Sequence, residues 1–417
     1  MTSLRTLVIT EALPYPPLVG KELRNWCNTC GLSSLGQVGI FGLCSNDPRR
    51  NQKSPPELQF WRCTTDEALA YPPPKKNSAA LTWPINPLGH PSDCYYSEVA
   101  AAEIVEIIAG YRPDVVVIEG LWLYRYIGYL APFNCRVVLD CHNVEAAVSQ
   151  EIIATLNENE LPWRLMRKLL PNRTKAIEQI AIKSVDQIWV CSENDARLMQ
   201  RTYDIPTSIH VIPNALDVNS YERVRARSYR YPNGVNSNGK VLIFPALFGW
   251  APNIVAASFL INELFPRLAK VYPDSQLILG GDRPSPEMID AARQDSRIMV
   301  TGAVPDMRPY LASASAMVVP LFQGGGTRFK ILEAFAAKLP VISTAKGAEG
   351  LAVQDGIHLL LAETADEFVD AVQRLWMDGH LAKQLAVNAL QLVTKSYSFP
   401  VISQQIADAV HELCSTD

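Results

Sequence analysis

The stretch "GGGTRFKILEAFAAKLPVISTAKGAEG", residues 324–350, places three glycines, two cations and one carboxylate around the start of a predicted helix. It follows the apolar run 316–320, so the glycines form a loop that leaves the carboxyl end of a strand. Backbone without side chains lets N–H groups approach an anion, and a helix N-terminus adds partial positive charge. Arg328 and Lys330 oppose that dipole unless an anion lies between them. The segment predicts an anion site; the alternative is a glycine turn with solvated cations.

Short β-branched runs recur along the chain and alternate with helical patterns. In the first half, strands are expected at 6–10, 114–120, 136–140 and 187–191, with helices at 97–110 and 162–185. The pattern restarts with strands expected at 241–246, 276–281, 297–302, 316–320, 340–344 and 358–362. Continuous apolar strands separated by helices indicate parallel sheets covered on both faces. We expect an α/β protein of two Rossmann-like, doubly wound domains.

The boundary between the domains is expected near a Gly-, Asn- and Pro-rich segment at 227–240. We predict an N-terminal domain over 1–218, a C-terminal domain over 219–396, and a last helix, 397–417, that packs back on the first domain. Residues 45–97 interrupt the pattern as an excursion rich in Pro and aromatic residues. This excursion either packs on the surface of its own domain or receives a substrate, and both interpretations stay open.

Composition narrows the class of protein. A net charge of −4 over 417 residues gives no reason to expect a nucleic acid as partner. No apolar run is long enough for a signal peptide or a membrane span, and nine cysteines show no disulfide framework. Cys27 and Cys30 form a single CxxC, which we interpret as two small residues on one helix face rather than a zinc site. We expect a cytoplasmic protein.

Glu333 lies one to two turns into the predicted helix, among apolar neighbours. A carboxylate at this place can accept hydrogen bonds from two ribose hydroxyls, as acidic residues do in nucleotide sites. The alternative is an ordinary glutamate on a helix surface. Diphosphate and ribose together indicate a nucleotide, and often a nucleotide sugar.

With these residues, 324–350 resembles the donor-site segment of glycosyltransferase family 4 and its close relatives, which have the GT-B fold of two Rossmann-like domains facing across a cleft. The resemblance covers most of the chain. It implies a hexosyltransferase-type enzyme (EC 2.4) that moves a sugar from a nucleotide sugar to an acceptor hydroxyl with retention at the anomeric carbon. Glycan, polysaccharide or glycoconjugate biosynthesis is the implied setting. The implied donor is a UDP- or GDP-sugar, and no other cofactor is required.

The resemblance also implies site residues in other loops. "PYPPLVGKELRNW" (14–26) resembles the first loop of the family, with Gly20 near the donor phosphate and Arg24 on the acceptor side. "LFGWAPNIVAA" (247–257) is the corresponding loop of the second domain. The residues implied at the donor are Gly20, Gly249, Trp250, Asn253, Gly324, Gly325, Gly326, Thr327 and Glu333.

"LDCHNVEA" (139–146) resembles the D-x-H-N segment of the family. His142 would then point toward the transferred sugar, and a histidine at a strand end beside polar neighbours favours a site residue over a structural one. Asn143 and Glu145 are candidates for the acceptor side.

The chain departs from the family pattern at two places. Many members carry a glutamate eight residues before the position of Glu333, where this chain has Gly325. That residue contacts the transferred sugar, so the sugar cannot be inferred and the effect on activity is open. Many members also carry cations in the loop after the first strand of the second domain, which here has none. Arg328 and Lys330 are expected to supply that charge.

The implied mechanism needs charge stabilisation at a departing diphosphate. We expect His142, Arg328 and Lys330 to be catalytic, aided by the amides of Gly325, Gly326 and Thr327. The departing phosphate oxygen can accept the proton of the acceptor, so no protein base is required. No DxD-like cluster stands at a strand end, so we predict no metal.

The acceptor is not specified by the sequence, and a glycan, a lipid-linked molecule or a small molecule each remain possible. The basic stretch 161–173 could lie on an anionic membrane at the inner face, although packing on the first domain is the favoured interpretation. A GT-B epimerase is disfavoured because no acid/base carboxylate pair is recognised in the first domain. A phosphorylase would need a cofactor lysine or a second phosphate site, and neither is evident in this sequence. A non-catalytic sugar-nucleotide-binding protein of the same fold stays an alternative.

Overall fold

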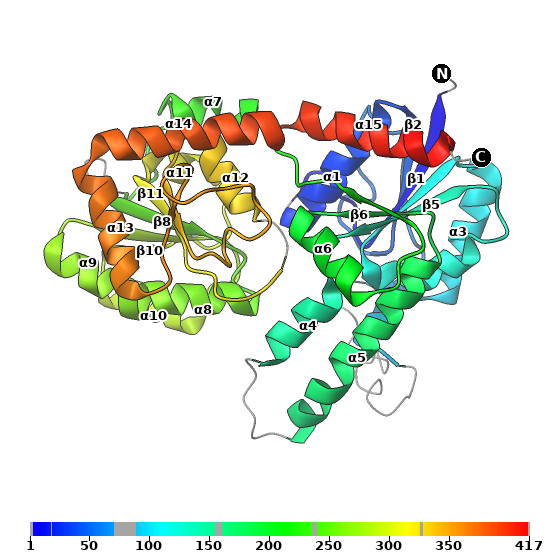
Figure 1. Ribbon diagram of the computed structural model, residues 1–417, viewed down its shortest axis with the longest axis horizontal. Helices are drawn as coiled ribbons and strands as arrows, with labels where there is room; N and C mark the ends of the chain where they lie inside the picture. The colour runs from blue at the N-terminus through cyan, green and yellow to red at the C-terminus, as the bar shows by residue number, and fades with distance from the viewer. Residues whose placement is uncertain are drawn as a thin grey trace. The chain divides into compact units, whose positions relative to one another are not determined.

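The computed structural model describes residues 3–17, 19–70, 89–154, 161–235, 240–325 and 328–415. The chain divides into two compact units, one formed by 1–214 with 402–417 and the other by 215–401. In each unit a parallel sheet packs between helices (Figure 1). These two sheets are the pair of Rossmann-like sheets that the strand pattern predicts.

The sheet of the first unit has the order β3-β2-β1-β4-β5-β6-β7, and every neighbouring pair is parallel. Its strands are β1 (Leu4–Thr10), β2 (Gly36–Gly42), β3 (Phe60–Cys63), β4 (Val115–Glu119), β5 (Arg136–Cys141), β6 (Gln187–Val190) and β7 (Ser208–Val211). Successive strands are added on one side of β1 up to β3 and on its other side from β4 onward, so the strand order reverses between β1 and β4. Ligands of doubly wound sheets bind at such a switch point, beside the carboxyl ends of the strands.

Helices flank this sheet on the long connections that parallel strands require. They are α1 (Gly20–Ser33), α3 (Glu98–Tyr111), α4 (Glu145–Ala154), α5 (Leu161–Lys183), α6 (Glu193–Thr202) and α15 (Phe399–Ser415), with the 3₁₀ helices η1 (Glu67–Leu69), η2 (Pro91–Tyr95) and η3 (Leu121–Tyr129). Helix α3 begins where the Ser97 side chain accepts a hydrogen bond from Ala100 N.

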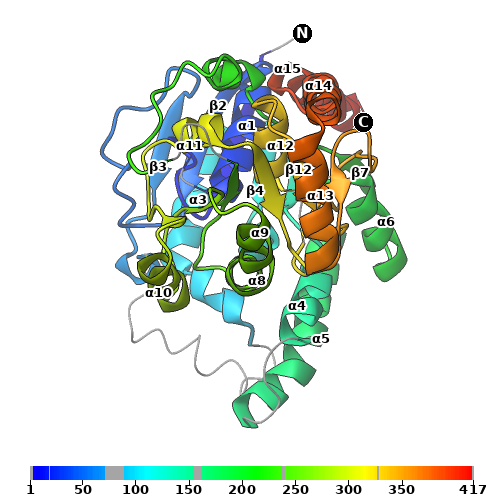
Figure 2. The ribbon, with the colours of Figure 1, turned by 90° about the vertical axis from the view of Figure 1, so that its left-hand side faces the viewer.

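The sheet of the second unit has the order β10-β9-β8-β11-β12-β13, again parallel throughout. Its strands are β8 (Val241–Pro245), β9 (Gln276–Gly280), β10 (Ile298–Val300), β11 (Ala316–Val319), β12 (Val341–Ser343) and β13 (Leu360–Leu361). The helices are η4 (Val218–Tyr221), α7 (Glu222–Arg225), α8 (Ala251–Phe259), the π-helical turn η5 (Leu260–Leu264), α9 (Phe265–Val271), α10 (Pro286–Gln294), α11 (Arg308–Ser313), α12 (Phe329–Ala336), α13 (Ala365–Met377) and α14 (Gly379–Ser396). Helices α8, η5 and α9 follow one another without a break from Ala251 to Val271, and Figure 2 views this stretch nearly end on. The switch point lies between β8 and β11.

Each strand predicted from an apolar run is present, because the central strands are buried on both faces. All five residues of β4 and of β8 are buried, for example. The pattern missed β2, β3 and β7. β3 lies inside the predicted excursion 45–97, where it pairs with β2 at the sheet edge. The part of that excursion at 71–88 lies outside the described residues.

The last helix packs on the first unit, as predicted. A Cβ atom at Gly31 of α1 would lie 2.7 Å from Ile406 Cδ1 of α15, so the glycine permits close contact of the two helices. Gln187 Nε2 of β6 also donates to Ala409 O at 3.0 Å. This hydrogen bond joins helix α15 to the sheet of the first unit.

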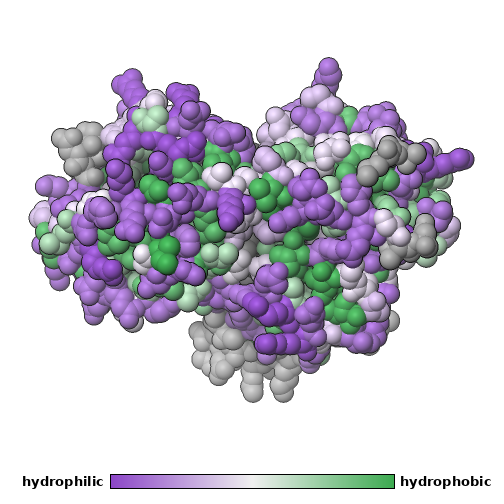
Figure 3. All heavy atoms as spheres, turned by 45° about the horizontal axis from the view of Figure 1, so that its top comes forward, coloured by the Kyte–Doolittle hydropathy of each residue, from purple (hydrophilic) through white to green (hydrophobic). Residues whose placement is uncertain are grey.

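Helices α4 and α5 lie side by side in the first unit (Figures 1 and 2). Helix α5 corresponds to the predicted helix 162–185, but the side chains of 161–168 lie outside the described residues. The proposed membrane contact through 161–173 therefore stays a prediction. Hydrophilic residues cover most of the surface in the view of Figure 3. No helix of the described segments is long and apolar enough to cross a bilayer.

Candidate active site

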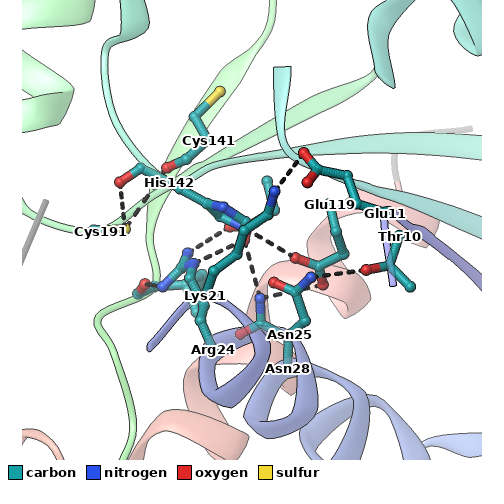
Figure 4. Close-up of polar contacts among 12 residues, drawn as sticks. Thr10, Glu11, Lys21, Arg24, Asn25, Asn28, Glu119, Cys141, His142 and Cys191 are labelled. Carbon is teal, nitrogen blue, oxygen red and sulfur yellow. Dashed lines mark hydrogen bonds and ion pairs between the residues drawn. The ribbon is translucent and has the colours of Figure 1, made fainter. Parts of the chain in front are cut away.

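Three ionisable side chains meet at the carboxyl ends of two central strands of the first unit (Figure 4). Glu119 is the last residue of β4 and pairs in register with Asp140 of β5. His142 follows, with its Nε2 3.4 Å from Glu119 Oε2 and 3.3 Å from Asp140 Oδ2. Both carboxyl groups are fully buried, whereas the His142 side chain keeps 14% of its surface exposed. The imidazole therefore lies between a buried acid pair and the surface of the unit.

Helix α1 supplies a positive charge to this acid pair. The Arg24 guanidinium donates to both oxygens of Asp140, through Nε at 2.7 Å and through Nη2. Its Nη1 donates to Ile212 O at 2.8 Å and to Asn214 Oδ1 at 3.0 Å. Arg24 is 2% exposed, so protein groups rather than solvent satisfy its donors.

Glu119 is surrounded by amides, and no arginine or lysine of the described residues forms an ion pair with it. Asn28 Nδ2 lies 3.4 Å from Glu119 Oε1 and 3.2 Å from Asp140 Oδ2. The Asn25 amide, oriented with its nitrogen inward, donates to Glu119 Oε2 at 3.1 Å and to Lys21 O at 2.9 Å. The two carboxyl groups thus differ in charge partner, although they are neighbours.

These surroundings separate the two carboxyl pKa values. Burial, with the Asp140 charge, raises the pKa of Glu119 to about 7. Burial also acts to raise the pKa of Asp140, but the Arg24 charge and the hydrogen bonds from His142 and Arg24 hold it well below its usual range. Burial acts to lower the pKa of His142, but its hydrogen bonds to Asp140 and Glu119 raise it. The cluster therefore holds one ionised acid, one acid that titrates near neutrality, and a base of raised pKa.

The ligand atoms of Glu119, Asp140 and His142 all lie within 4.8 Å of one another, as those of a metal site would. Arg24 already donates two hydrogen bonds to Asp140 and supplies the cation beside it. A metal ion would have to repel or displace this buried guanidinium. The arrangement fits a proton-binding cluster better than a metal centre, and we assign no metal to it.

The expectation that the first domain lacks a carboxylate pair is wrong. Glu119 and Asp140 end neighbouring strands and meet because parallel strands place their carboxyl ends at one edge. They are nevertheless not two equivalent acids, since Arg24 neutralises Asp140.

The loop after His142 is held by a third buried carboxylate, Glu178. Glu178 of α5 accepts from the backbone N of Glu145 at 2.9 Å and of Ala146 at 3.1 Å, the first amides of α4. Burial raises the pKa of Glu178 to about 7. Asn143 Nδ2 donates to Glu145 Oε1 at 3.0 Å. Two of the three predicted acceptor-side residues, Asn143 and Glu145, thus contact each other beside His142.

In the second unit, the glycine loop wraps around the guanidinium of Arg328. Its Nη1 donates to Gly325 O and its Nη2 to Gly324 O, both at 2.6 Å. Gly324 has φ +94°, a conformation that favours glycine, and an added Cβ would lie 3.3 Å from Arg328 Nη2. The predicted residues Gly326 and Thr327 lie outside the described residues. Arg328 therefore fixes the loop at the start of α12.

Lys330 lies at the switch point between β8 and β11. Its Nζ contacts Asn253 Oδ1 at 3.2 Å and lies 4.1 Å from the centroid of the Phe244 ring. Asn253 is itself fixed by donation from Nδ2 to Leu247 O at 2.8 Å. Burial, and then the charge of Arg328, lower the pKa of Lys330 to about 7. No carboxylate of the described residues lies within ion-pair distance of this amine.

Glu333 lies one turn further along α12. The hydroxyl of Tyr221 in η4 donates a hydrogen bond to Glu333 Oε1 at 2.6 Å. The tyrosine does not bind the second carboxylate oxygen, Oε2. Burial raises the pKa of Glu333, while the hydrogen bond from Tyr221 and the charge of Lys330 act against this shift. A carboxylate oriented in this way by a tyrosine is suited to accept from hydroxyl groups of a ligand.

The loop after β8 carries the remaining predicted donor residues. Trp250 precedes α8 and is 42% exposed. Gly249 lies against Arg283, which follows β9, because an added Cβ at Gly249 would lie 3.1 Å from Arg283 Cδ. A cation thus lies beside the loop in which the sequence shows none. Gly20 is an exposed residue at the first position of α1 in the other unit.

The predicted residues form two sets, one in each unit. Gly20, Arg24, His142, Asn143 and Glu145 lie around the carboxyl ends of β1, β4 and β5, and the remaining predicted residues lie around those of β8 and β11. Sequence reasoning missed Glu119, Asn25, Asn28, Tyr221 and Arg283. Two of these had a usable signal, since Glu119 and Arg283 both follow apolar runs at the carboxyl ends of strands.

The two sheets with their switch-point loops define a protein of the GT-B fold, and comparison with known proteins agrees. The chain resembles the crystal structure of sucrose-phosphate synthase from Thermosynechococcus elongatus, with a TM-score of 0.74 and 17% identity over 99% of this chain and 100% of that chain. It also resembles HepE of Anabaena in complex with UDP-glucose, with a TM-score of 0.66 and 13% identity over 98% and 100%. The lipopolysaccharide outer core galactosyltransferase WaaB gives 0.61 and 14% over 98% and 99%.

Two family models match separate parts of the chain. Residues 64–220 match the model described as Glycosyltransferase Family 4, and residues 239–378 match the model described as Glycosyl transferases group 1. None of the curated protein sequences compared with the chain matches it. The chain belongs to glycosyltransferase family 4, among the group 1 glycosyl transferases, and it is a retaining enzyme that transfers a sugar from a nucleotide sugar.

Proposed function

We propose that the second unit binds the donor as a UDP- or GDP-sugar, with Arg328 and Lys330 on its diphosphate and Glu333 on its ribose. The position of Lys330 carries this proposal. An ammonium group on an aromatic face, beside a second cation and without a carboxylate partner among the described residues, is poorly stabilised alone. A bound diphosphate at the switch point would supply the missing negative charge.

The chemistry of the departing diphosphate fits these residues. Negative charge grows on the β-phosphate as the glycosidic bond breaks, and fixed cations stabilise that charge more strongly in the transition state than before it. Arg328 is already held in place by two carbonyl oxygens of the glycine loop. Lys330 is held by Asn253. Both cations would therefore need little rearrangement when the donor binds.

The first unit contributes the acceptor side in this proposal. His142 would contact the transferred sugar, with Asn143 and Glu145 toward the acceptor and Gly20 near the donor phosphate. Arg24 acts through Asp140 rather than by touching a substrate, since its donors are taken up by protein groups. The domain roles follow the prediction of an N-terminal acceptor domain, 1–218, and a donor domain, 219–396, with the terminal segment 397–417 packed on the former.

Choice of UDP is supported by a relative of the same fold, since HepE binds UDP-glucose in its crystal structure. An acceptor in glycan or glycoconjugate synthesis is supported by WaaB, which is named as a lipopolysaccharide galactosyltransferase. None of the nine cysteines forms a disulfide, which supports the proposal of a cytoplasmic location. Peripheral contact to the inner membrane face through 161–173 belongs to the same proposal.

The test is direct binding of nucleotides by calorimetry, together with release of nucleoside diphosphate from a panel of UDP-, GDP-, ADP- and dTDP-sugars. We expect one nucleotide to bind, and we expect Lys330→Met and Arg328→Met each to weaken it by about tenfold or more, as for a lost charge-assisted bond. Lys338→Met is the matched control, because Lys338 is exposed at the opposite end of α12. Equal affinity in all three variants would contradict the proposal.

A further inference from the structure

The two nitrogen atoms of His142 have different surroundings. Nε2 faces Glu119 Oε2 at 3.4 Å and Asp140 Oδ2 at 3.3 Å. The opposite edge of the ring lies toward Gly120, where an added Cβ would be 3.8 Å from Cε1 and 3.9 Å from Nδ1. Gly120 has φ +105° and, as a glycine, places no side chain of its own over this edge of the ring. Two acceptors on one nitrogen require a proton on it, so Nε2 carries a hydrogen and Nδ1 is the nitrogen without a carboxylate neighbour among the described residues.

The inward acceptors are not equivalent in charge. Asp140 is neutralised by the guanidinium of Arg24, which donates to both of its oxygens. Glu119 is equally buried, yet among the described residues its hydrogen-bond donors are the amides of Asn25 and Asn28 and the imidazole of His142. A buried carboxylate is costly unless it is paired. Of the groups that contact Glu119 in the described part of the chain, the imidazole is the one that can become a cation.

Other charged groups near the ring are already engaged. Lys21 forms an ion pair with Glu11, and Glu145 accepts from Asn143. The Cys191 thiol donates to His142 O at 3.3 Å, and burial raises its pKa to about 12, so it stays neutral. The Asn25 nitrogen lies 2.9 Å from Lys21 O and 3.1 Å from both His142 Nε2 and Glu119 Oε2. An amide has two hydrogens, and with one on Lys21 O the other goes to the carboxylate, the stronger acceptor, so that Nε2 keeps its own proton.

We propose that Glu119 is a positioning residue that pairs with His142, holding the imidazole as a cation with Nε2–H inward and Nδ1–H directed at a hydroxyl oxygen of the transferred sugar. The sugar-facing part of this inference rests on the proposed role of His142 in donor turnover. Glu119 touches no substrate and acts through the ring. The proton on Nδ1 is not consumed, because the departing phosphate accepts the proton of the acceptor hydroxyl.

The ionisation behaviour of the cluster agrees with this assignment. Burial, with the charge of Asp140, raises the pKa of Glu119 to about 7, and the carboxylates raise the pKa of His142 in spite of its burial. The ion pair therefore forms as the pH rises through about 7 and persists until the imidazole loses its proton. Because Arg24 keeps Asp140 ionised throughout, the change in charge falls on Glu119 and His142.

The test is an NMR titration of ¹⁵N-labelled histidines in the full chain, which has six. The His142→Gln variant assigns the signal, and exposed His380 is the internal reference. We expect a pKa for His142 above 6.5, an Nε2–H tautomer once the ring is neutral, and a second inflection near pH 7 from Glu119. In Glu119→Gln the pKa of His142 should fall by about 1–3 units, as for loss of an adjacent opposite charge, and the inflection near pH 7 should disappear.

Glu103→Gln is the matched control, since Glu103 is a hydrogen-bonded carboxylate of the same unit that binds Thr64 and Thr65 instead. It should leave the His142 titration unchanged. A wild-type pKa below 6.5, or an unchanged titration in Glu119→Gln, would overturn the inference. If Glu119→Gln does not fold, Glu119→Asp withdraws the carboxylate from Nε2 and should lower the His142 pKa in the same direction.

These arms need no donor, so they remain informative if the donor proposal fails. A separate arm adds the sugar nucleotide that turns over and compares the pH dependence of kcat in wild type and Glu119→Gln. We expect the change near pH 7 in the wild-type profile to be absent from the variant. An identical profile in both proteins would remove the link to catalysis.

Discussion

Replacement of Arg24 by methionine removes the guanidinium that pairs with both oxygens of Asp140, while it keeps a side chain of similar length. Arg24 makes four hydrogen bonds, two to Asp140 and one each to Ile212 O and Asn214 Oδ1. Both partners of the ion pair are buried, at 3% and 0% side-chain exposure. Arg24→Met would leave Asp140 as a buried carboxylate whose remaining hydrogen-bond partners among the described residues are Asn28 and His142.

Breaking a buried pair by removing one partner costs about 3–5 kcal/mol, because the other charge stays in the interior. That is a large part of the ~5–15 kcal/mol by which a domain is stable. For a unit of this size, about 2–4 °C of melting temperature corresponds to 1 kcal/mol, so we expect a fall of roughly 6–20 °C in the Tm of the first unit.

Calorimetry measures this Tm, and amide hydrogen exchange of peptides from β4 and β5 assigns the transition to the first unit. Arg136→Met is the control, since Arg136 pairs with Asp186 at 3.6 Å in the same unit with about a third of each side chain exposed. It should cost less than about 1 kcal/mol. Adding Asp140→Asn to Arg24→Met should recover part of the loss, because the uncompensated charge is then gone.

The pH dependence gives a second check of the same reasoning. Asp140 has a depressed pKa in the folded chain, so its contribution to stability is present above the unfolded pKa, about 3.9, and is lost as pH falls through the folded pKa. The difference between wild type and Arg24→Met should therefore shrink as the pH falls below about 4. A Tm within 2 °C of wild type at pH 7, or a difference that grows in acid, would refute the argument.

Three further outcomes are expected. Gly281→Ala should destabilise the second unit by about 3 kcal/mol or more, since its Cβ would lie 1.9 Å from Ala246 O at φ +140°; Gly302→Ala, at φ +63° in open space, should cost about 1–2 kcal/mol in chemical denaturation. Donor binding at pH 8 should take up close to one proton, measured by calorimetry in buffers of different ionisation enthalpy, because a diphosphate restores the charge of Lys330, whose pKa lies at about 7 in the free protein; uptake that persists in Lys330→Met would disprove this origin. The stability of the first unit should fall as the pH rises from about 5 to about 7, because Glu119 and Glu178 bind protons more tightly folded than unfolded, and a flat profile in this interval would contradict both raised pKa values.

The sequence predicts the central strands because these are buried on both faces and therefore read as continuous apolar runs. It fails for β2, which is largely buried but carries Gly36, Gly39 and Gly42 in place of β-branched residues. At Gly39 an added Cβ would lie 2.3 Å from atoms of the Phe60 ring of β3, so the missing side chain is what permits this packing. The edge strands β3 and β7 are only four residues long and partly exposed, which leaves no apolar run to recognise.

For the candidate site, the sequence indicates which loops carry functional residues more readily than which side chains contact one another. The glycines and cations of 324–330 are contiguous, so their chemistry is visible without a fold. The partner of Glu333 is Tyr221, which lies 112 residues earlier in the chain. In the first unit, Arg24 and Asp140 are separated by 116 residues. No local pattern predicts such pairs, although the rule that parallel strands end at one edge would have brought Glu119 and Asp140 together.

Helix α1 carries a sequence signal that could have predicted the buried carboxyl groups, namely polar residues on its inner face. Its buried residues include Arg24, Asn25, Asn28 and Thr29, so much of the face that it turns inward is polar. A helix on a parallel sheet normally buries an apolar stripe, and burying polar groups is costly unless each finds a partner. Here the partners are the carboxyl groups that end β4 and β5, which are equally costly to bury alone. The polar side chains of α1 and the carboxyl groups of β4 and β5 therefore offset each other's cost of burial. The arrangement stabilises the fold little beyond what apolar residues would provide. A buried polar contact that stabilises so little is best explained by function: its carboxyl groups hold the imidazole of His142 at the surface of the unit.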